Sequence, residues 1–302
     1  MTSRVAVTGS SGLIGSALVR SLRAAGVTVV RLVRHEPRAA DEARWDPSGR
    51  RREQNAAALA GCTALVHLAG AGVGDKRWTT RYKQEIRDSR VLGTAALATA
   101  LAALPEPPRT FLCGSAIGYY GDTGERAVDE TAPVGTGFLA EVCREWEAAA
   151  RPAERAGIRT VLLRTGLVVA RSGGPWSRLF PLFRAGLGGR LGDGRQYWSA
   201  ISLHDHIAAL RFLLDHETLS GPVNLTGPHP LTNREVTAVM GRVLRRPTLL
   251  HVPAPLLRIV LGEFAGDVLG SQRVLPRRLL DAGFRFAHPT VEEAVRAAVF
   301  EG

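Results

Sequence analysis

Three glycines stand at an even spacing near the start of the chain, in the stretch VAVTGSSGLIGSALV; they are Gly9, Gly12 and Gly15. Apolar residues precede them and a helical pattern follows, so they occupy a turn from a strand into a helix. Glycine permits the backbone angles that such a turn needs, and without a Cβ it lets a pyrophosphate approach the main chain. The N–H groups of the helix N-terminus then bind the phosphates. The pattern predicts dinucleotide binding.

Each glycine of this loop is expected to have its own role. Gly9 makes the turn, Gly12 allows the close approach of the phosphates, and Gly15 lets the helix pack on the strand. The hydroxyls of Ser10 and Ser11 add hydrogen-bond donors. The spacing G-x-x-G-x-x-G differs from the commoner G-x-G-x-x-G, and a tight turn without a ligand is the alternative. The residues expected to contact the cofactor are Gly9, Ser10, Ser11, Gly12, Leu13, Ile14 and Gly15.

The second expected strand ends in VVRLVRHEP, and this end indicates which dinucleotide is bound. Chains that bind NAD place Asp or Glu about 20 residues after the loop to hold the ribose 2′-hydroxyl. Here Arg34 occupies that position, and a guanidinium binds a 2′-phosphate in a bidentate manner. We therefore expect NADP(H), with Arg34 on the 2′-phosphate and with Arg31 or His35 as possible helpers. The alternative is that Arg34 is merely exposed, because arginines are abundant in this chain.

Strand and helix patterns alternate through the first half of the chain. We expect strands at 4–7, 27–33, 64–70, 109–115 and 159–169, and helices at 13–26, 79–104 and 137–157. A looser polar stretch covers 35–54. Strands separated by helices of this length form parallel sheets through βαβ crossovers. The predicted fold class is α/β, with a Rossmann-like, doubly wound parallel sheet.

The pattern changes after about residue 171. Residues 171–200 are rich in glycine and aromatic residues and predict a loop-dominated substrate region. A helix follows at 204–216, a strand at 221–227, and a helix at 232–246 with Thr232 as its N-cap. From about Val252 the chain is mostly helical, and its last helix covers 290–299. We therefore predict an NADP-binding Rossmann domain over 1–170, joined by some later segments, and a smaller, mostly helical C-terminal substrate domain over 171–302.

Composition excludes several classes of function. The 302 residues carry a net charge of +11, but the arginines are scattered, so we expect no nucleic-acid partner. No apolar run is long enough for a membrane span, and no secretory signal is visible, so we expect a cytoplasmic protein without a membrane partner. The three cysteines are widely spaced, and His204 and His206 lack a clear third ligand, so we expect no metal. A monomer or a homodimer is expected.

Several further stretches carry a resemblance to a known family. Together with the glycine loop, LVHLAG, SAIGYYGD and VLLRTGLVV make the chain similar to the extended short-chain dehydrogenase/reductases, which include the nucleotide-sugar epimerases. KRWTTRYKQEIRDSRVLGT, GRLGDGRQYWSAISLHDHIAAL and GSQRVLPRRLLDAGFRFAHPTVEEA resemble an atypical, sulA-like epimerase-family subgroup with a C-terminal domain of unknown function. The resemblance implies NADP(H) lined by Leu68, Ala69 and Gly70, with Ser115 beside the nicotinamide and the C-terminal half closing over a substrate.

The chain departs from this family at the residues that carry its chemistry. The family uses a tyrosine as proton donor and a lysine four positions later, together with a serine or threonine. Here Phe138 stands in the tyrosine position and Val142 in the lysine position, and no lysine follows Lys83. The serine position falls on Ala116, so that Ser115 lies one residue early. Arg90 stands where relatives often have asparagine.

Another residue must therefore exchange the proton if hydride chemistry takes place. The catalytic candidates are Ser115, Tyr120 and Glu141. Tyr119, Cys143, His204 and Asp205 are further candidates for this proton exchange. Each has a structural alternative: Tyr120 packs at the strand end, Glu141 lies on the surface, Cys143 lies in the core, and Asp205 sits near a helix cap.

Two classes of function remain. The first is an oxidoreductase or epimerase that acts on an unidentified small substrate, which is carbonyl or sugar-nucleotide-like. The expected substrate contacts are Tyr119, Arg190, Arg195, Tyr197 and Trp198. The second is a non-catalytic NADP(H) sensor or scaffold, favoured by the missing tyrosine and lysine. No G-x-S-x-G, H-E-x-x-H or lysine-terminated phosphate loop supports a hydrolase or an ATPase.

Overall fold

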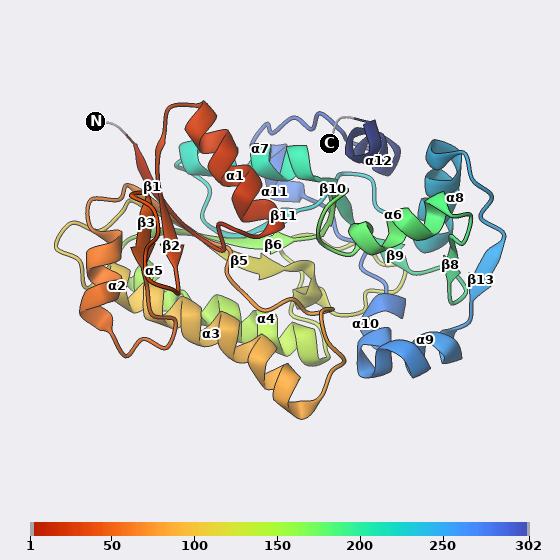
Figure 1. Ribbon diagram of the computed structural model, residues 1–302, viewed down its shortest axis with the longest axis horizontal. Helices are drawn as coiled ribbons and strands as arrows, with labels where there is room; N and C mark the ends of the chain where they lie inside the picture. The colour runs from red at the N-terminus through yellow and green to blue at the C-terminus, as the bar shows by residue number, and fades with distance from the viewer. Residues whose placement is uncertain (1–2, 301–302) are drawn as a thin grey trace.

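A seven-stranded parallel sheet forms the centre of the molecule in the computed structural model, which describes residues 3–300 (Figure 1). The strand order is β11-β6-β5-β4-β1-β2-β3, so β1 lies where the order reverses. All neighbouring strands of this sheet run parallel. The strands are β1 (Arg4–Thr8), β2 (Thr28–Val33), β3 (Glu42–Arg44), β4 (Ala64–His67), β5 (Thr110–Ala116), β6 (Arg159–Thr165) and β11 (Gly221–Leu225).

Helices cover both faces of the sheet (Figure 1). One layer contains α1 (Leu13–Ala24), α7 (Leu203–Asp215) and the short α11 (Arg277–Asp281). The other contains α2 (Arg52–Leu59), α3 (Thr80–Ala102), α4 (Phe138–Ala149) and α5 (Arg151–Arg155). Each layer has its own buried cluster against the sheet; Val and Leu dominate on the α1 side, and Leu and Ala with two Trp dominate on the α3 side. This three-layer arrangement is the Rossmann-like fold that the sequence predicts.

A smaller region lies beyond the carboxyl ends of the strands, on the right in Figure 1. Its core gathers Trp176, Phe180 and Met240 among other apolar residues. Its strands pair in two-stranded sheets: β7 (Leu167–Val169) with β10 (Ala200–Ser202), β8 (Gly189–Leu191) with β13 (Leu250–Val252), and β9 (Tyr197–Trp198) with β12 (Leu231–Thr232). Its helices are α6 (Trp176–Arg184), α8 (Asn233–Leu244), α9 (Ala254–Leu261), α10 (Ala265–Leu269) and α12 (Val291–Phe300). Two short 3-10 helices are also present: η1 (Ile117–Tyr120) follows β5, and η2 (Gly262–Phe264) follows α9.

The order of the main elements follows the sequence prediction, and one helix start is confirmed in detail. The Thr232 hydroxyl accepts a hydrogen bond from the Glu235 main-chain N–H, while the Glu235 carboxylate accepts from the Thr232 N–H, which forms a capping box at the start of α8. Similarly, Ser202 caps α7 by accepting from the Asp205 N–H at 2.9 Å. Local side-chain bonds thus fix both helix starts.

Four expected elements are wrong in detail. The polar stretch 35–54 contains the edge strand β3 and the start of α2, because a three-residue strand at a sheet edge needs no apolar run. The expected helix 137–157 breaks into α4 and α5, since Pro152 has no N–H for the helical ladder. The expected strand 159–169 divides at Gly166 as the chain crosses to β10. The loop region 171–200 contains α6, whose period Pro181 obscures.

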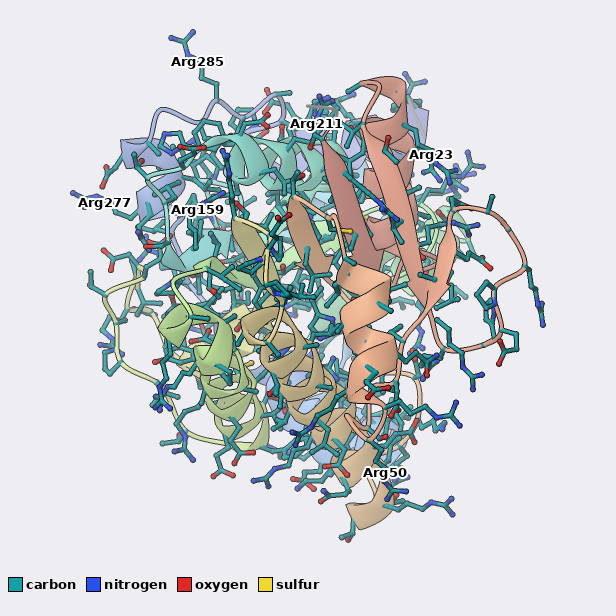
Figure 2. The ribbon with its side chains drawn as sticks, turned by 90° about the vertical axis from the view of Figure 1, so that its left-hand side faces the viewer. Arg23, Arg50, Arg159, Arg211, Arg277 and Arg285 are labelled. Carbon is teal, nitrogen blue, oxygen red and sulfur yellow. The ribbon has the colours of Figure 1, made fainter. Side chains whose placement is uncertain are left out.

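The arginines are spread over many elements. Figure 2 labels six of them, and they lie apart from one another on this face rather than in one patch. Arg23 pairs with Asp41, and Arg159 donates to main-chain oxygens that include Leu219 O at 2.9 Å. Within residues 3–300, no helix combines the length and the apolar character needed to cross a membrane.

Candidate functional site

The glycine loop after β1 is packed so closely that two of its glycines admit no side chain. Gly9 has φ +63°, and a Cβ on it would lie 2.9 Å from the Leu68 carbonyl carbon. A Cβ on Gly15 would lie 2.1 Å from the Gly9 carbonyl oxygen. The Gly12 N–H donates to that same oxygen at 3.0 Å, which closes the turn. The loop therefore holds its shape through main-chain contacts, as expected for a phosphate cradle.

The position of this loop in the sheet is where such folds bind their ligands. It follows β1, which lies between β2 and β4 at the reversal of the strand order. Gly12 is the N-cap of α1, no side chain caps the helix, and its first turn carries no acidic residue. The N-terminal N–H groups and the helix dipole thus present positive charge to the loop, which suits a diphosphate. Ser10 is buried here, whereas Ser11 and Gly12 are exposed.

Thr8 and His67, which the sequence analysis missed, connect the ends of β1 and β4 by hydrogen bonds. The Thr8 hydroxyl lies 2.7 Å from His67 Nδ1 and accepts from the N–H groups of Leu68 at 3.0 Å and Ala69 at 3.2 Å. His67 is fully buried, and burial lowers its pKa to about 3, so its imidazole is neutral. The residues expected to line the cofactor, Leu68, Ala69 and Gly70, follow directly. A histidine within the apolar run ALVHLAG was the available signal.

The end of β2 presents one unengaged cation. Arg34 is exposed and makes no hydrogen bond or ion pair with any residue in the described range 3–300. Arg31 instead donates to the Asp41 carboxylate at 2.7 Å and lowers the pKa of Asp41. The His35 ring bonds the Glu36 main-chain oxygen at 2.8 Å. Of the three basic residues considered at this strand end, Arg34 alone has no partner within 3–300.

A buried ion pair lies at the carboxyl ends of β5 and β6. Arg164 donates through Nε to Glu147 Oε1 at 2.8 Å and through Nη2 to Oε2 at 2.9 Å. The two side chains are 4% and 10% exposed. Ser115, at the end of β5, donates its hydroxyl proton to Glu147 Oε1 at 2.7 Å. The bidentate geometry fixes Ser115 and both charges in place.

Tyr120 belongs to the same buried network. Its hydroxyl accepts from Arg164 Nη1 at 2.9 Å and donates to Asn224 Oδ1 at 2.8 Å. The Asn224 main-chain N–H in turn donates to Glu130 Oε1 at 2.9 Å. Burial raises the pKa of Tyr120 to about 12. This hydroxyl therefore connects η1 to β6 and β11 through hydrogen bonds.

Tyr119 differs from its neighbour in both exposure and bonding. It is half-buried, and the Arg164 guanidinium carbon lies 3.5 Å from its ring centroid. This is a close cation–π contact. Within residues 3–300, the Tyr119 hydroxyl has no hydrogen-bond partner. Tyr119 thus places an unengaged phenol, with a cation on its ring face, beside the end of β5.

The chain matches a family model described as the NAD dependent epimerase/dehydratase family over residues 5–226, and a domain of unknown function over 252–298. It belongs to the NAD dependent epimerase/dehydratase family. Among relatives of this epimerase family, one from Mycobacterium leprae is 48% identical over 295 residues, which cover 97% of this chain and 95% of that one. The epimerase family protein SDR39U1 of Bos taurus is 33% identical over 302 residues, 98% of this chain and 99% of that one.

Solved structures extend the likeness of this epimerase-family chain. The crystal structure of human epimerase family protein SDR39U1 with NADPH has a TM-score of 0.91 and 31% identity, and covers 98% of this chain and 99% of that one. A Thermus thermophilus UDP-glucose 4-epimerase complex with NAD has a TM-score of 0.75 at 21% identity, with coverage of 98% of each chain. That second likeness concerns the fold.

The two positions that the resemblance assigns to the family's tyrosine and lysine lie on α4, and both are apolar here. Phe138 packs edge-on against Trp78 with ring centroids 5.0 Å apart, and Val142 is buried. Glu141 lies exposed in the first turn of α4, while Cys143 is buried, which raises its pKa to about 12. Glu141 therefore faces solvent, whereas Cys143 lies in the core beside the Ser115 network, close to Glu147 and Arg164.

Arg90 and the expected substrate residues lie around this end of the sheet. Arg90 donates to Ile86 O at 3.0 Å, and its guanidinium would be 3.3 Å from a Cβ on Gly70, so it reaches the end of β4. Arg195 is exposed and pairs with Glu125 at 3.1 Å. Half-buried positions on β8 and β9 hold Arg190, Tyr197 and Trp198. The structure thus places these expected substrate contacts in the smaller region, on elements other than the one that carries Tyr119.

Proposed function

We propose that this chain binds NADP(H) and uses it as an oxidoreductase or epimerase on a small carbonyl or sugar-nucleotide-like substrate. The observation that carries the proposal is the glycine loop at the strand-order reversal, with an unengaged Arg34 at the end of the neighbouring strand. Human SDR39U1, whose crystal structure is with NADPH, supports the choice of cofactor through its likeness to this chain. The buried free cysteines fit a reducing compartment, and we propose the cytoplasm.

The preference for NADP(H) over NAD(H) rests on the charges after β2. An acidic residue there would hold a ribose 2′-hydroxyl and repel a 2′-phosphate. The acids of this segment are already engaged: Glu36 pairs with Arg44, while Asp41 and Glu42 pair with Arg31. Arg34 is left to bind an incoming phosphate.

Replacing Arg34 by alanine tests this assignment. A charge-assisted contact of this kind contributes about 1.5–3 kcal/mol, so the Kd for NADPH should rise roughly 10- to 100-fold. The Kd for NADH should change less than about 2-fold, since NADH carries no 2′-phosphate. Isothermal titration calorimetry on the purified protein measures both values. Arg285→Ala is the matched control, because Arg285 is also exposed and its side chain projects from the surface (Figure 2). Equal losses for both cofactors would remove the 2′-phosphate assignment.

We assign the proton exchange to Tyr119. Among the candidates at this end of the sheet, Tyr120 has its hydroxyl engaged twice, Ser115 donates to Glu147, and Glu141 faces solvent. Tyr119 keeps an unengaged hydroxyl, and Arg164 supplies positive charge against its ring. Arg164 is a positioning residue in this proposal.

The test compares Tyr119→Phe with Tyr120→Phe. Loss of a general acid lowers turnover by about 10²- to 10⁴-fold, so Tyr119→Phe should do so while its NADPH affinity stays within about 2-fold. Tyr120→Phe removes the neighbouring hydroxyl and should keep most of the turnover. Oxidation of NADPH is followed by its fluorescence with a panel of carbonyl compounds and nucleotide sugars. Full activity in Tyr119→Phe would exclude this role.

A non-catalytic NADP(H) sensor or scaffold is the second candidate. The observation in its favour is that Phe138 and Val142 fill the tyrosine and lysine positions as packed apolar residues. Tight NADPH binding by the wild-type protein, without turnover of any compound in the panel, would favour this function over the enzyme.

A further inference from the structure

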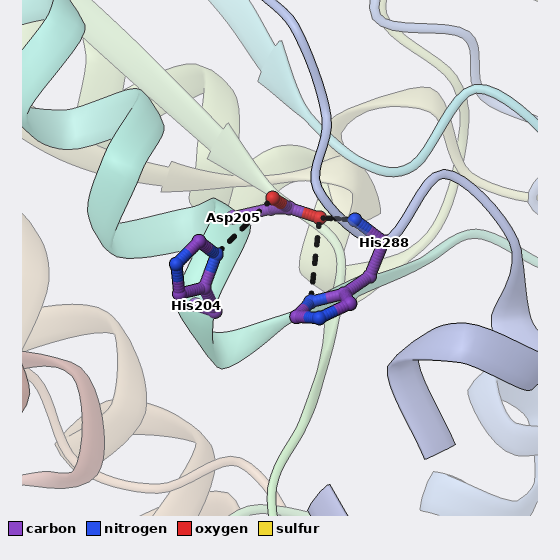
Figure 3. A group of neighbouring side chains, drawn as sticks. All are labelled: His204, Asp205 and His288. Atoms are coloured by element: carbon purple, nitrogen blue, oxygen red, sulfur yellow. Dashed lines mark hydrogen bonds and ion pairs between the residues drawn. The ribbon is translucent and has the colours of Figure 1, made fainter. Parts of the chain in front are cut away.

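Two histidines and one aspartate, distant from the glycine loop in sequence, form a compact cluster (Figure 3). His204 and Asp205 lie in the first turn of α7, and His288 lies in the turn that leads to α12. His204 Nδ1 is 3.4 Å from Asp205 Oδ1, and His288 Nδ1 is 3.9 Å from Asp205 Oδ2. One ligand atom from each residue lies within 4.8 Å of the other two.

These separations are close to those of a metal centre. Ligand atoms about 2.0–2.1 Å from a tetrahedral ion lie roughly 3.4 Å from one another. The separation of His204 Nδ1 from Asp205 Oδ1 already has this value. His288 Nδ1 faces the other carboxylate oxygen and also lies 3.1 Å from Ser202 Oγ, so the His288 ring exchanges that hydrogen bond for the ion when it turns to complete the set. The pairing of His204 with His206 considered from the sequence does not form, because His206 is buried and bonds Thr165 instead.

The carboxylate at the centre of the cluster accepts hydrogen bonds from main-chain N–H groups. Asp205 is 1% exposed, and its two oxygens accept from the N–H groups of Ala287 at 2.8 Å and His288 at 2.9 Å. A carboxylate oxygen has two acceptor sites, so each keeps one for an ion. Ligating carboxylates in metal proteins are oriented by outer hydrogen bonds of this kind.

We propose that His204, Asp205 and His288 bind a divalent transition-metal ion, with Zn²⁺ as the best fit. Two imidazoles and one carboxylate are a borderline donor set that suits zinc, whereas Mg²⁺ and Ca²⁺ prefer oxygen ligands alone. The site opens to solvent on one side, since the His204 side chain is 65% exposed. A water molecule completes the coordination there.

Such an ion would join two parts of the fold. Asp205 begins α7, which packs against α1 in a helical layer of the central sheet. His288 precedes α12, whose apolar face packs in the core of the smaller region. The ion thus clamps the C-terminal segment onto the start of α7. Because the set is assembled only in the folded chain, binding raises the temperature of unfolding.

The experiment uses the full chain after treatment with a chelator, with Zn²⁺ as the probe and Mg²⁺ as the hard-ion comparison. Calorimetry should show one Zn²⁺ per chain at micromolar or tighter Kd. At a Zn²⁺ concentration about 100-fold above Kd the melting temperature should rise by about 5 °C. Mg²⁺ should give neither effect. Cobalt(II) in place of zinc should give visible absorption bands that report on its ligands.

His204→Ala and His288→Ala test the residues, and His251→Ala is the matched control because His251 is exposed and lies on β13. His204 is mostly exposed, so His204→Ala should fold normally. We expect each ligand variant to weaken Zn²⁺ binding at least about 20-fold and to lose the melting shift, while His251→Ala binds like the wild type. Absence of zinc binding in the wild type, or equal affinity in all variants, would overturn the proposal. Neither result bears on NADPH binding.

Discussion

Two sites on the carboxyl edge of the sheet, the glycine loop after β1 and the network at β5 and β6, are built by different means. At β1 the main chain forms the site: Gly9 and Gly15 contact other main-chain atoms at distances that admit no Cβ, and the N-terminus of α1 supplies the positive charge. At β5 and β6 side chains form the site. Arg164 and Glu147 form a buried bidentate pair, and Ser115 and Tyr120 bond to them.

The difference shows how each end can change without loss of the fold. The diphosphate cradle depends on close approach, so it tolerates almost no substitution at its glycines. The other end depends on mutual satisfaction of buried polar groups, which a different set of residues also achieves. This is consistent with a chain that keeps the loop while Phe138 and Val142 stand where the resemblance expects a tyrosine and a lysine. Substitutions in the glycine loop should therefore weaken cofactor binding, whereas substitutions in the buried network should lower the free energy of unfolding.

Gly15→Ala should have the largest effect on cofactor binding. The new Cβ would lie 2.1 Å from Gly9 O, a main-chain atom that cannot move without opening the loop. The Kd for NADPH should rise at least about 100-fold, equivalent to roughly 3 kcal/mol. Gly266→Ala is the control, because a Cβ there meets nothing within 4 Å. Fluorescence titration with NADPH measures both, and near-wild-type affinity in Gly15→Ala would contradict the main-chain cradle.

In the buried network at β5 and β6, Glu147→Gln should mainly lower the free energy of unfolding. It leaves the Arg164 guanidinium buried without its counter-charge, which costs about 3–5 kcal/mol. Urea unfolding followed by circular dichroism measures the loss. Glu141→Gln, on the same helix but exposed, should change the free energy of unfolding by less than about 0.5 kcal/mol. A loss no greater in Glu147→Gln than in Glu141→Gln would show that the pair contributes little.

The same contrast explains what the sequence could predict. The glycine loop and Arg34 are local features, since a few consecutive residues define a turn and a strand end. The fold class follows from the alternation of strand and helix patterns, and the family likeness fixes it. The short edge strand β3 and the helix α6 were missed, because the first lacks an apolar run and Pro181 interrupts the second.

The buried network has no comparable local pattern. Tyr120 and Asn224 lie 104 residues apart, and Asn224 and Glu130 lie 94 apart, so only the fold brings them together. Glu147 on an amphipathic helix looks like a surface residue. One signal was available: Arg164 stands within the apolar run VLLRTGLVV, and a charge inside a buried strand requires a partner. The sequence did not indicate which partner.

Two buried histidines, one beside each of these two sites, allow the comparison to be sharpened by pH. His67 bonds Thr8 beside the glycine loop, and His206 bonds Thr165 at the end of β6. Burial lowers the pKa of each to about 3, from an ordinary value of 6.5. Between these values the unfolded chain binds a proton that the folded chain does not, so stability is complete above the ordinary pKa and falls as the pH drops below it.

From pH 7 to pH 5 each histidine should remove about 2 kcal/mol from the free energy of unfolding. His67→Gln and His206→Gln should each abolish about that part of the acid sensitivity, whatever their effect at pH 7. The exposed His229→Gln should leave the pH dependence unchanged. Urea unfolding at pH 5, 6 and 7 measures the slope. Equal contributions from His67 and His206 would mean that the surroundings of both histidines exclude water equally. A missing contribution from one would show that water reaches that histidine in the folded chain.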